Sequence, residues 1–446
     1  PENSNLLDQI ARGLGEILDV EPSFVYEQAA DKQYRYKVIS RKISEELADE
    51  VRAFVSENKI TGVYLETDLK RYYPNSSLAA QALGFVSSDN NGSEGLEAYY
   101  NEELSGTAGK VVTSKGNYGS EMPYTYEKYY DASDGCSLVT TIDATVQAYV
   151  EKNLQNAIDK YDIKNGAFCI VMDVNTGEIK AMATLGSYDP NNYLEIYDDA
   201  AAALLENERD AALSLPEASD AYKAAIEQYK QDVASARMAQ WRNRCVSDGY
   251  EPGSTFKLAT MLTLLDDARM PVTTVYDTHN GDPVTVGPAR NIRDSHRGDR
   301  EIDFRRAVAS SSNVYFAKAI WDRYGSTGRK QEYSDFLHKE LHLGQTVGLE
   351  RLGERKPSVT TDWKVPDPGV MLVKMSYGYR VRLAPIQMIT FYNAIANGGK
   401  MISPVLVREL RRGDRVEERF ESRTIASSIA SRAALREVQQ CLQAVC

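Results

Sequence analysis

The chain has 446 residues, too many for one hydrophobic core, so two or more domains are expected. Its 64 acidic residues outnumber its 52 Lys and Arg residues, and the net charge of -12 argues against a polyanionic partner such as nucleic acid. A hydrophobic content of 42% is ordinary for a globular protein, and no run of about twenty apolar residues predicts a transmembrane helix.

The first region of the chain, residues 1–135, contains one clear helix pattern. Apolar residues recur at helical spacing over residues 44–59, and two acidic residues fall in the first turn, where they favour the helix dipole. We expect a strand over residues 61–67 and a domain boundary near residues 132–135. These elements predict a separate N-terminal domain.

A second set of elements follows this boundary. Residues 137–142 alternate in polarity and predict a strand, and Asp143 can cap a helix that runs to about residue 161. Apolar segments at residues 167–172 and 179–184 predict two further strands. Their connection resembles a calcium loop only superficially, because it lacks the alternating ligands of an EF-hand, and we expect a hairpin turn.

Residues 195–240 form an alanine-rich segment of high helix propensity. Between residues 198 and 232 the segment carries nine acidic and three basic residues, and Pro216 is expected to separate two helices. A solvated helical hairpin is the simplest interpretation of this insertion. A lid or a partner-docking arm is the alternative.

The segment at residues 251–257 has the features of an acyl-transfer centre. Pro252 and Gly253 break the preceding element and an apolar run follows, so Ser254 is expected at a helix N-terminus. Lys257 lies three residues later, which places both side chains on one helix face. A buried amine with a lowered pKa can take the proton of a serine hydroxyl, and helix N–H groups can stabilise the developing negative charge.

A second short motif, Ser311-Ser312-Asn313, lies downstream in a segment rich in small residues and precedes an apolar stretch. S-x-x-K and S-x-N are two parts of the motif set of penicillin-binding proteins and β-lactamases. A chance match is the simpler interpretation of the first motif, and a serine-rich helix cap is the simpler interpretation of the second.

Other kinds of chemistry have little support in the sequence. His338 and His342 have the i, i+4 spacing of a metal-binding pair but do not form H-E-x-x-H, so we expect no metal site and no cofactor. The sequence also contains no phosphate-binding loop and no dinucleotide fingerprint. The five cysteines form no CxxC pair, and Cys169, within an expected strand, is interpreted as a small buried side chain.

Further segments accompany the two motifs in a fixed order. They are residues 71–74, 79–86 and 95–97 in the first region, and residues 250–257, 292–296, 311–313, 375–379, 384–388 and 396–400 in the second. Through these segments, over about residues 35–410, the chain resembles the class B penicillin-binding proteins, the monofunctional transpeptidases of peptidoglycan synthesis.

The resemblance implies an α+β multidomain fold. Residues 1–135 would form an N-terminal pedestal, or dimerisation-type, domain, and residues 136–446 would form a penicillin-binding transpeptidase domain. In the second domain, helices would pack on a mostly antiparallel sheet. The acidic insertion at about residues 195–240 would lie between the early strands and the nucleophile helix.

One motif of that family is missing. Its K-[TS]-G tripeptide lies on a strand that lines the active site, and no such tripeptide occurs between Pro1 and Cys446. Ser114-Lys115-Gly116 has the wrong residue order. We expect the transpeptidase domain to be truncated before this motif and to lack its last strands, and a degenerate homologue is the alternative. The missing strand would provide part of the oxyanion hole and the contact to the substrate carboxylate, so the sequence leaves the activity of this chain by itself undecided.

The resemblance also implies roles for the matching residues. Ser254 would attack the carbonyl of a D-Ala-D-Ala stem peptide, with its own N–H as half of the oxyanion hole, and Lys257 would be the activating base. Ser311 would relay a proton to the leaving amine. Asn313 would hydrogen-bond the substrate amide and orient Lys257, and Ser312 would join it in substrate binding.

The expected function is that of a serine D,D-transpeptidase that cross-links stem peptides through an acyl-enzyme on Ser254 and is a target of β-lactams. Such an enzyme would act at the extracytoplasmic face of the bacterial cell membrane, beside a membrane glycosyltransferase, held by an N-terminal anchor outside this chain. Two alternatives stay open: a non-catalytic scaffold of a cell-wall complex, and a domain that hydrolyses or senses β-lactams. A transpeptidase would form a long-lived acyl-enzyme, a hydrolase a short-lived one, and a scaffold none.

Overall fold

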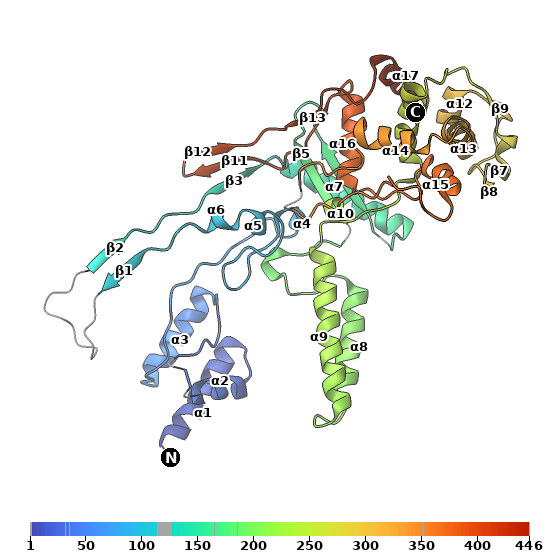
Figure 1. The fold of residues 1–446 in the computed structure, drawn as a ribbon. Coiled ribbons are helices and arrows are strands. Elements are labelled where there is room, and N and C mark those ends of the chain that lie inside the picture. Colours follow the sequence, from blue (N-terminus) through green and yellow to red (C-terminus); the bar gives the residue numbers. More distant parts are fainter. Residues whose placement is uncertain are drawn as a thin grey trace. The chain divides into compact units, whose positions relative to one another are not determined.

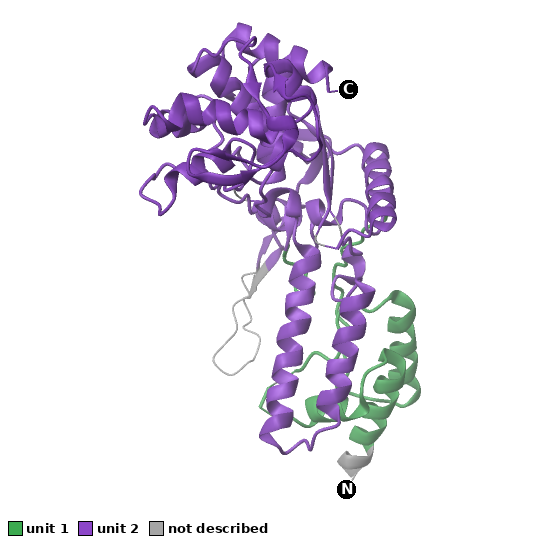
Figure 2. Ribbon diagram, turned by 90° about the vertical axis from the view of Figure 1, so that its right-hand side faces the viewer, with its two compact units in different colours: residues 1–74, 86–93 green, residues 75–85, 94–446 purple. Residues whose placement is uncertain are grey.

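The computed structural model describes residues 2–31, 33–34, 36–113, 127–164, 166–184, 186–349 and 352–445. The chain divides into two compact units, residues 1–74 with 86–93 and residues 75–85 with 94–446 (Figure 2). The tripeptide Ser114-Lys115-Gly116 and the terminal Cys446 lie outside the described residues. The domain boundary expected near residues 132–135 falls within the second unit and stays a prediction.

The described residues of the first unit form three helices. They are α1 (Glu2–Leu18), α2 (Pro22–Ala30) and α3 (Glu45–Glu57) (Figure 1). Ser44 caps α3 by accepting a hydrogen bond from the backbone N–H of Leu47, which confirms the helix predicted from residue 44. Apolar side chains from the three helices, among them Leu14, Val25 and Val51, share one small core.

The strand predicted over residues 61–67 is wrong. Within the described residues of the first unit there is no strand beside this segment, so its backbone N–H and C=O groups have no sheet to join. Its large apolar side chains are exposed instead, Tyr64 by 82% and Leu65 by 40%. The apolar pattern therefore did not correspond to a half-buried strand.

In the second unit, the paired strands are antiparallel, in agreement with the expected mostly antiparallel sheet. The pairs are β1 (Lys110–Thr113) with β2 (Glu127–Tyr130); β3 (Ser137–Thr140), β11 (Val407–Arg412) and β12 (Arg415–Arg419) in the order β12-β11-β3; β4 (Phe168–Met172) with β5 (Ile179–Thr184); β6 (Tyr276–Asp277) with β9 (Glu301–Ile302); β7 (Val284–Val286) with β8 (Ala289–Ile292); and β10 (Met401–Ile402) with β13 (Thr424–Ala426). The predicted strands at residues 137–142, 167–172 and 179–184 are confirmed as β3, β4 and β5.

The two edges of the β4–β5 sheet differ. Helix α7 (Ala144–Tyr161), which Asp143 caps as predicted, places Gln147 against the outer edge of β5. The Gln147 amide donates to the Met182 carbonyl oxygen at 2.9 Å, and the Met182 N–H donates to the Gln147 side-chain oxygen at 2.7 Å. Among the described residues no strand pairs with the outer edge of β4, so only the β5 side is closed.

The acidic insertion folds as a helical hairpin. Helices α8 (Asp199–Leu213) and α9 (Asp220–Trp241) lie side by side in both ribbon views, and Pro216 lies between them (Figures 1 and 2). Ser219 caps α9 by accepting a hydrogen bond from the Tyr222 N–H at 3.0 Å. No residue of α9 is buried, which fits a solvated hairpin.

Most of the remaining helices surround the largest core of the chain (Figure 1). They are α11 (Lys257–Leu262), α12 (Phe304–Ala309), α13 (Asn313–Ile320), α14 (Lys330–Lys339), α15 (Pro368–Met375), α16 (Pro385–Ala396) and α17 (Arg432–Gln443). Helix α10 (Arg244–Ser247) packs in a second cluster, and the short helices α4 (Ala80–Leu83), α5 (Gly95–Tyr99) and α6 (Asn101–Ser105) precede the strands. All six residues of α11 are buried, so this helix is a fixed platform for the residues at its start. Within the described ranges, no helix combines the length and the hydropathy needed to cross a bilayer.

Candidate active site

Ser254 lies in a tight turn that leads into α11. Residues Gly253–Phe256 form a 3₁₀ turn and the α-helix continues from Lys257, so the serine is near a helix N-terminus, as predicted. A second backbone segment supports this turn, because the Gly253 N–H donates to the Gly378 carbonyl oxygen at 3.1 Å. A Cβ atom on Gly378 would lie 1.9 Å from the Gly253 carbonyl oxygen, so only glycine permits the approach.

Lys257 is the buried cation of the site, with 4% of its surface exposed. Its amine nitrogen Nζ lies 3.2 Å from Ser254 Oγ, 3.0 Å from Ser311 Oγ and 2.6 Å from the Ser311 carbonyl oxygen. Burial lowers the pKa of Lys257 to about 8, and the negative charge of Asp294 opposes this shift. Half of the amine is therefore neutral near pH 8, as a general base requires.

The structure thus brings together three residues that the sequence separates. Ser254 and Ser311 are 57 positions apart, yet both hydroxyls contact one nitrogen atom. Both serines are exposed, so a substrate can reach them, whereas Lys257 is covered. The amine can exchange protons with either hydroxyl without contact with bulk water.

A strained turn aims Ser311 at the lysine. Ser311 has a positive φ of 52°, in the left-handed region that costs a residue other than glycine about 1–3 kcal/mol. Two backbone hydrogen bonds hold the turn: the Ser311 N–H donates to the Val308 carbonyl oxygen at 3.0 Å, and the Ser312 N–H donates to the Ala307 carbonyl oxygen at 2.9 Å. This conformation presents both oxygen atoms of Ser311 to Lys257.

Ser312 acts inside the fold. Its hydroxyl accepts a hydrogen bond from the Tyr315 N–H at 3.0 Å, which caps α13, and donates to the Asp294 carboxylate at 2.8 Å. Asp294 also accepts from the Val314 N–H at 2.9 Å. Because Ser312 is only 1% exposed and its hydroxyl is engaged, the predicted substrate contact finds no support in this geometry. The helix-cap interpretation describes this serine better.

Asn313 is half-buried at the start of α13. Its amide donates to the Arg293 carbonyl oxygen at 3.0 Å, which fixes one end of the side chain. Among the described residues no hydrogen bond joins Asn313 to Lys257, so the predicted orienting role stays a prediction. Contact of Asn313 with a substrate amide stays a prediction as well.

Asp294 is the functional residue to which sequence reasoning gave no role. It belongs to the segment at residues 292–296, which contributed only to the family resemblance. Its carboxylate fixes Ser312 and the first turn of α13, and it favours the charged form of Lys257. An acidic residue 18 positions before a serine has no spacing rule, so only the folded chain reveals this contact.

These groups suit acyl transfer. They provide an exposed hydroxyl as nucleophile, a buried amine as base, a second hydroxyl as proton carrier and helix-start N–H groups for a developing oxyanion. In the part of the chain that the structure describes, no group of three or more His, Cys, Asp or Glu is placed to hold a metal ion.

Two family models match the chain. Residues 1–140 match the penicillin-binding protein dimerisation domain. Residues 167–446 match the penicillin binding protein transpeptidase domain, which includes every residue of the site described above.

Curated relatives match most of this chain. Stage V sporulation protein D of Bacillus subtilis (strain 168) is 27% identical over 404 residues, which cover 90% of this chain and 54% of the relative. The peptidoglycan D,D-transpeptidase FtsI of Escherichia coli (strain K12) is 26% identical over 370 residues, which cover 83% of this chain and 53% of the relative. The chain spans about half the length of the curated relatives it matches.

Solved structures share the fold. Penicillin Binding Protein 2X from Streptococcus thermophilus matches with a TM-score of 0.64 at 20% identity, over 99% of this chain and 59% of that one. A peptidoglycan synthetase from Bifidobacterium adolescentis ATCC 15703 matches with a TM-score of 0.64 at 20% identity, over 98% of this chain and 70% of that one. At such identities the likeness shows the fold alone.

Proposed function

This chain belongs to the class B penicillin-binding proteins, and on that premise we propose that it forms the acyl-transfer part of a serine D,D-transpeptidase that cross-links peptidoglycan stem peptides. One observation carries the proposal: Lys257 Nζ lies between two exposed hydroxyls, 3.2 Å from Ser254 Oγ and 3.0 Å from Ser311 Oγ. A base in this position can take a proton from the nucleophile and pass it toward a leaving group.

In the first half of the reaction, Ser254 Oγ attacks the carbonyl carbon of the penultimate D-Ala while neutral Lys257 takes the hydroxyl proton. The tetrahedral intermediate places its negative oxygen near the Ser254 N–H at the start of the helix. Ser311 then relays a proton from the lysine to the nitrogen of the terminal D-Ala. The C–N bond breaks, D-Ala leaves, and an ester to Ser254 remains.

In the second half, an amine from a neighbouring stem peptide attacks this ester. Its proton returns through Ser311 and Lys257 to the oxygen of Ser254, so the new peptide bond forms and the enzyme is restored. β-Lactams would acylate the same hydroxyl, because they present a strained amide to it. Asn313 is proposed to hydrogen-bond the amide of the donor, with Arg293 fixing its orientation from behind.

The family's last strands, one of which carries K-[TS]-G, are proposed to continue the sheet from the outer edge of β4. This strand is apolar throughout, FCIVM, as strands in the interior of a sheet are, and within the described residues its outer edge has no partner strand. The Phe168 ring at its start packs against Tyr250, with ring centroids 5.3 Å apart. Because Tyr250 precedes Ser254 by four residues, a strand added here would lie beside the nucleophile turn.

The complete protein is proposed to act at the extracytoplasmic face of a bacterial membrane, with an anchor outside this chain and a membrane glycosyltransferase as partner. One alternative is a non-catalytic scaffold of a cell-wall complex. A β-lactam-hydrolysing or sensing domain is the other alternative. The acyl-enzyme separates them, since it would be long-lived for a transpeptidase, short-lived for a hydrolase and absent for a scaffold.

Labelling by a fluorescent penicillin tests the proposal. In the complete protein, we expect Ser254→Ala to abolish covalent labelling, because the attacking hydroxyl is gone. Ser310→Ala is the matched control: the hydroxyl of this exposed serine donates to the Arg306 carbonyl oxygen at 2.8 Å, and its removal should leave labelling unchanged. Persistent labelling of the Ser254→Ala protein, located by peptide mass mapping, would show that another residue is the nucleophile.

A further inference from the structure

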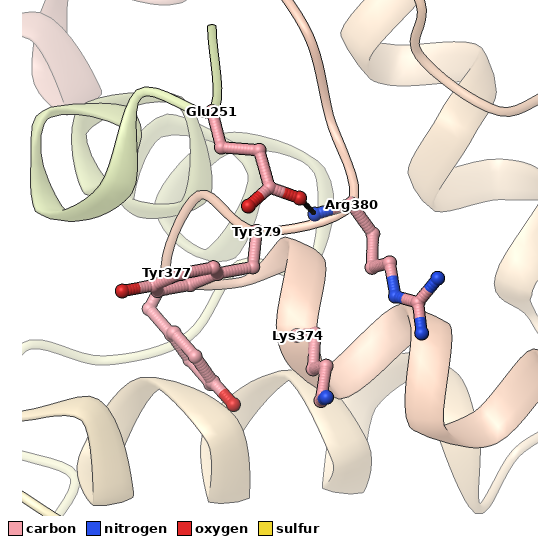
Figure 3. Close-up of a pocket in the computed structure, with 5 residues that line it drawn as sticks. All are labelled: Glu251, Lys374, Tyr377, Tyr379 and Arg380. Carbon is pink, nitrogen blue, oxygen red and sulfur yellow. Dashed lines mark hydrogen bonds between the residues drawn. The ribbon is translucent and has the colours of Figure 1, made fainter. Parts of the chain in front are cut away.

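A polar pocket of about 320 Å³ lies beside the nucleophile turn, outside the acyl-transfer residues (Figure 3). Its lining residues are Glu251, Lys374, Tyr377, Tyr379 and Arg380. Glu251 comes from the segment before Ser254, and the other four come from the end of α15 and the loop that follows it.

The segments that line the pocket contact segments of the proposed active site. Tyr377 packs in one apolar cluster with Val314, the residue directly after Asn313. The neighbouring Gly378 is in backbone contact with Gly253, the residue directly before the nucleophile. The backbone of Gly253 and Gly378 therefore connects the pocket to the nucleophile turn.

The pocket contains two cationic groups that lack protein partners. Neither the Lys374 ammonium nor the Arg380 guanidinium has a hydrogen-bond or ion-pair partner among the described residues. In Figure 3 the Glu251 carboxylate faces the backbone nitrogen of Arg380, and both cationic ends extend away from it. Two positive charges against one negative charge leave a net charge of about +1 in the pocket.

Arg380 is held in place by its backbone. Its φ of 64° lies in the left-handed region, which a residue with a long side chain rarely adopts. The Arg380 N–H donates to Glu251 Oε1 at 2.9 Å, so the carboxylate stabilises this turn. An unusual backbone conformation that places a charged side chain at a pocket is typical of a binding position.

We propose that this pocket binds a single carboxylate of the donor stem peptide, upstream of its D-Ala-D-Ala end. The inference rests on the proposed function. Lys374 and Arg380 would contact the carboxylate, and the Tyr377 and Tyr379 hydroxyls would donate hydrogen bonds to it. A more highly charged group such as a phosphate fits less well, because Glu251 would repel its second charge.

Tyr377 suits this role because it remains a protonated donor. Burial raises the pKa of Tyr377 to about 12, so its hydroxyl keeps its proton at every pH at which the enzyme would work. Tyr379 is 49% exposed and its ring lies 5.7 Å from that of Tyr377, which forms an aromatic wall beside the cations. Such a wall lowers the local dielectric constant and strengthens a charge contact at the pocket.

Competition with a fluorescent penicillin measures binding without requiring turnover. The competitors are synthetic stem peptides that end in D-Ala-D-Ala and carry one carboxylate besides the terminal one, either on the residue directly before that pair or on the residue before it. Each has a matched carboxamide analogue. For at least one of the two positions, we expect the carboxylate peptide to halve the rate of Ser254 acylation at about one tenth of the concentration that the carboxamide needs. The position that shows the preference identifies the source of the carboxylate.

Charge variants then assign the preference to this pocket. In the complete protein, Lys374→Gln and Arg380→Gln should each reduce the tenfold ratio below about threefold, and Lys374→Arg should retain it. Glu251→Gln keeps an oxygen for the Arg380 N–H but loses the negative charge, so the ratio should increase. If these residues had a purely structural role, the ratio would not decrease in the Lys374 and Arg380 variants and increase in the Glu251 variant. Thermal unfolding of each variant checks the fold. If Arg380→Gln fails to fold, the comparison of Lys374→Gln with Lys374→Arg is the test.

The outcomes separate this inference from the proposed function. If the penicillin does not acylate the wild-type protein, the proposed function fails. If acylation is normal but carboxylate and carboxamide peptides compete equally, or do not compete at all, the pocket proposal alone fails. It fails as well if the ratio persists unchanged in the Lys374→Gln protein.

Discussion

The rate at which a penicillin acylates Ser254 should follow the titration of Lys257. Only the neutral amine can accept the hydroxyl proton, and burial lowers the pKa of this amine from the ordinary value of 10.5 to about 8. The rate should therefore increase with pH up to about 8 and then level off as the last ammonium is lost. The Asp294 carboxylate, which favours the charged form, keeps this pKa from falling further.

The expected magnitude follows from the neutral fraction. With a pKa of about 8, roughly 0.1 of the amine is neutral at pH 7, about 0.5 at pH 8 and about 0.9 at pH 9. The rate should then increase about tenfold from pH 7 to pH 9, and by little above pH 9. A lysine with the ordinary pKa of 10.5 would give an increase of about a hundredfold over the same range, without a plateau.

Stopped-flow fluorescence with a fluorescent penicillin, at constant ionic strength from pH 6.5 to 9.5, measures this profile in the complete protein. Loss of the free penicillin by hydrolysis at each pH is the control, and intact mass confirms a single adduct. A rate that does not change with pH would show that Lys257 is not the base. A rate that still increases tenfold per pH unit at pH 9.5 would contradict the burial argument.

Two substitutions extend this reasoning. Lys257→Met should abolish acylation yet increase the free energy of unfolding by about 1 kcal/mol at pH 7. Because burial lowers the pKa of Lys257, the folded state is destabilised, and this cost is complete below pH 8. The methionine removes the cost but also loses the hydrogen bonds to Ser311, so the net gain is small. The cost disappears as pH increases from about 8 to 10.5, so thermal unfolding should show the gain at pH 7 and no gain at pH 10.5. Gly378→Ala should slow acylation at least tenfold and cost about 2 kcal/mol, because its Cβ would lie 1.9 Å from the Gly253 carbonyl oxygen. Gly298→Ala, where a Cβ meets open space, is its control, and equal effects of the two alanines on acylation and on unfolding would refute the steric explanation.

Local patterns predicted the local structure of this chain well. The spacing of apolar residues predicted α3, and Asp143 predicted the start of α7, because a helix and its cap involve residues only three or four positions apart. The same argument placed Ser254 one turn before Lys257. It failed at residues 61–67, since a strand requires a partner and the described part of the first unit provides none.

Contacts between distant segments could not be derived from spacing. The family resemblance, and not any local rule, linked Ser311 to Lys257 across 54 positions. The role of Asp294 and the close approach of Gly378 to the nucleophile turn appear only in the folded chain. The sequence around Ser312 is compatible with both a substrate contact and a helix cap. The burial of the Ser312 side chain in the folded chain favours the cap.

The contact between Gly253 and Gly378 is made by main-chain atoms alone, with no flexible side chain to absorb a displacement. A shift in either loop must therefore pass to the other. Binding in the pocket next to Gly378 and non-covalent binding at Ser254 are then linked, and each changes the affinity of the other by the same factor. An inhibitor that occupied both places would experience this linkage, whereas one confined to the serine would not.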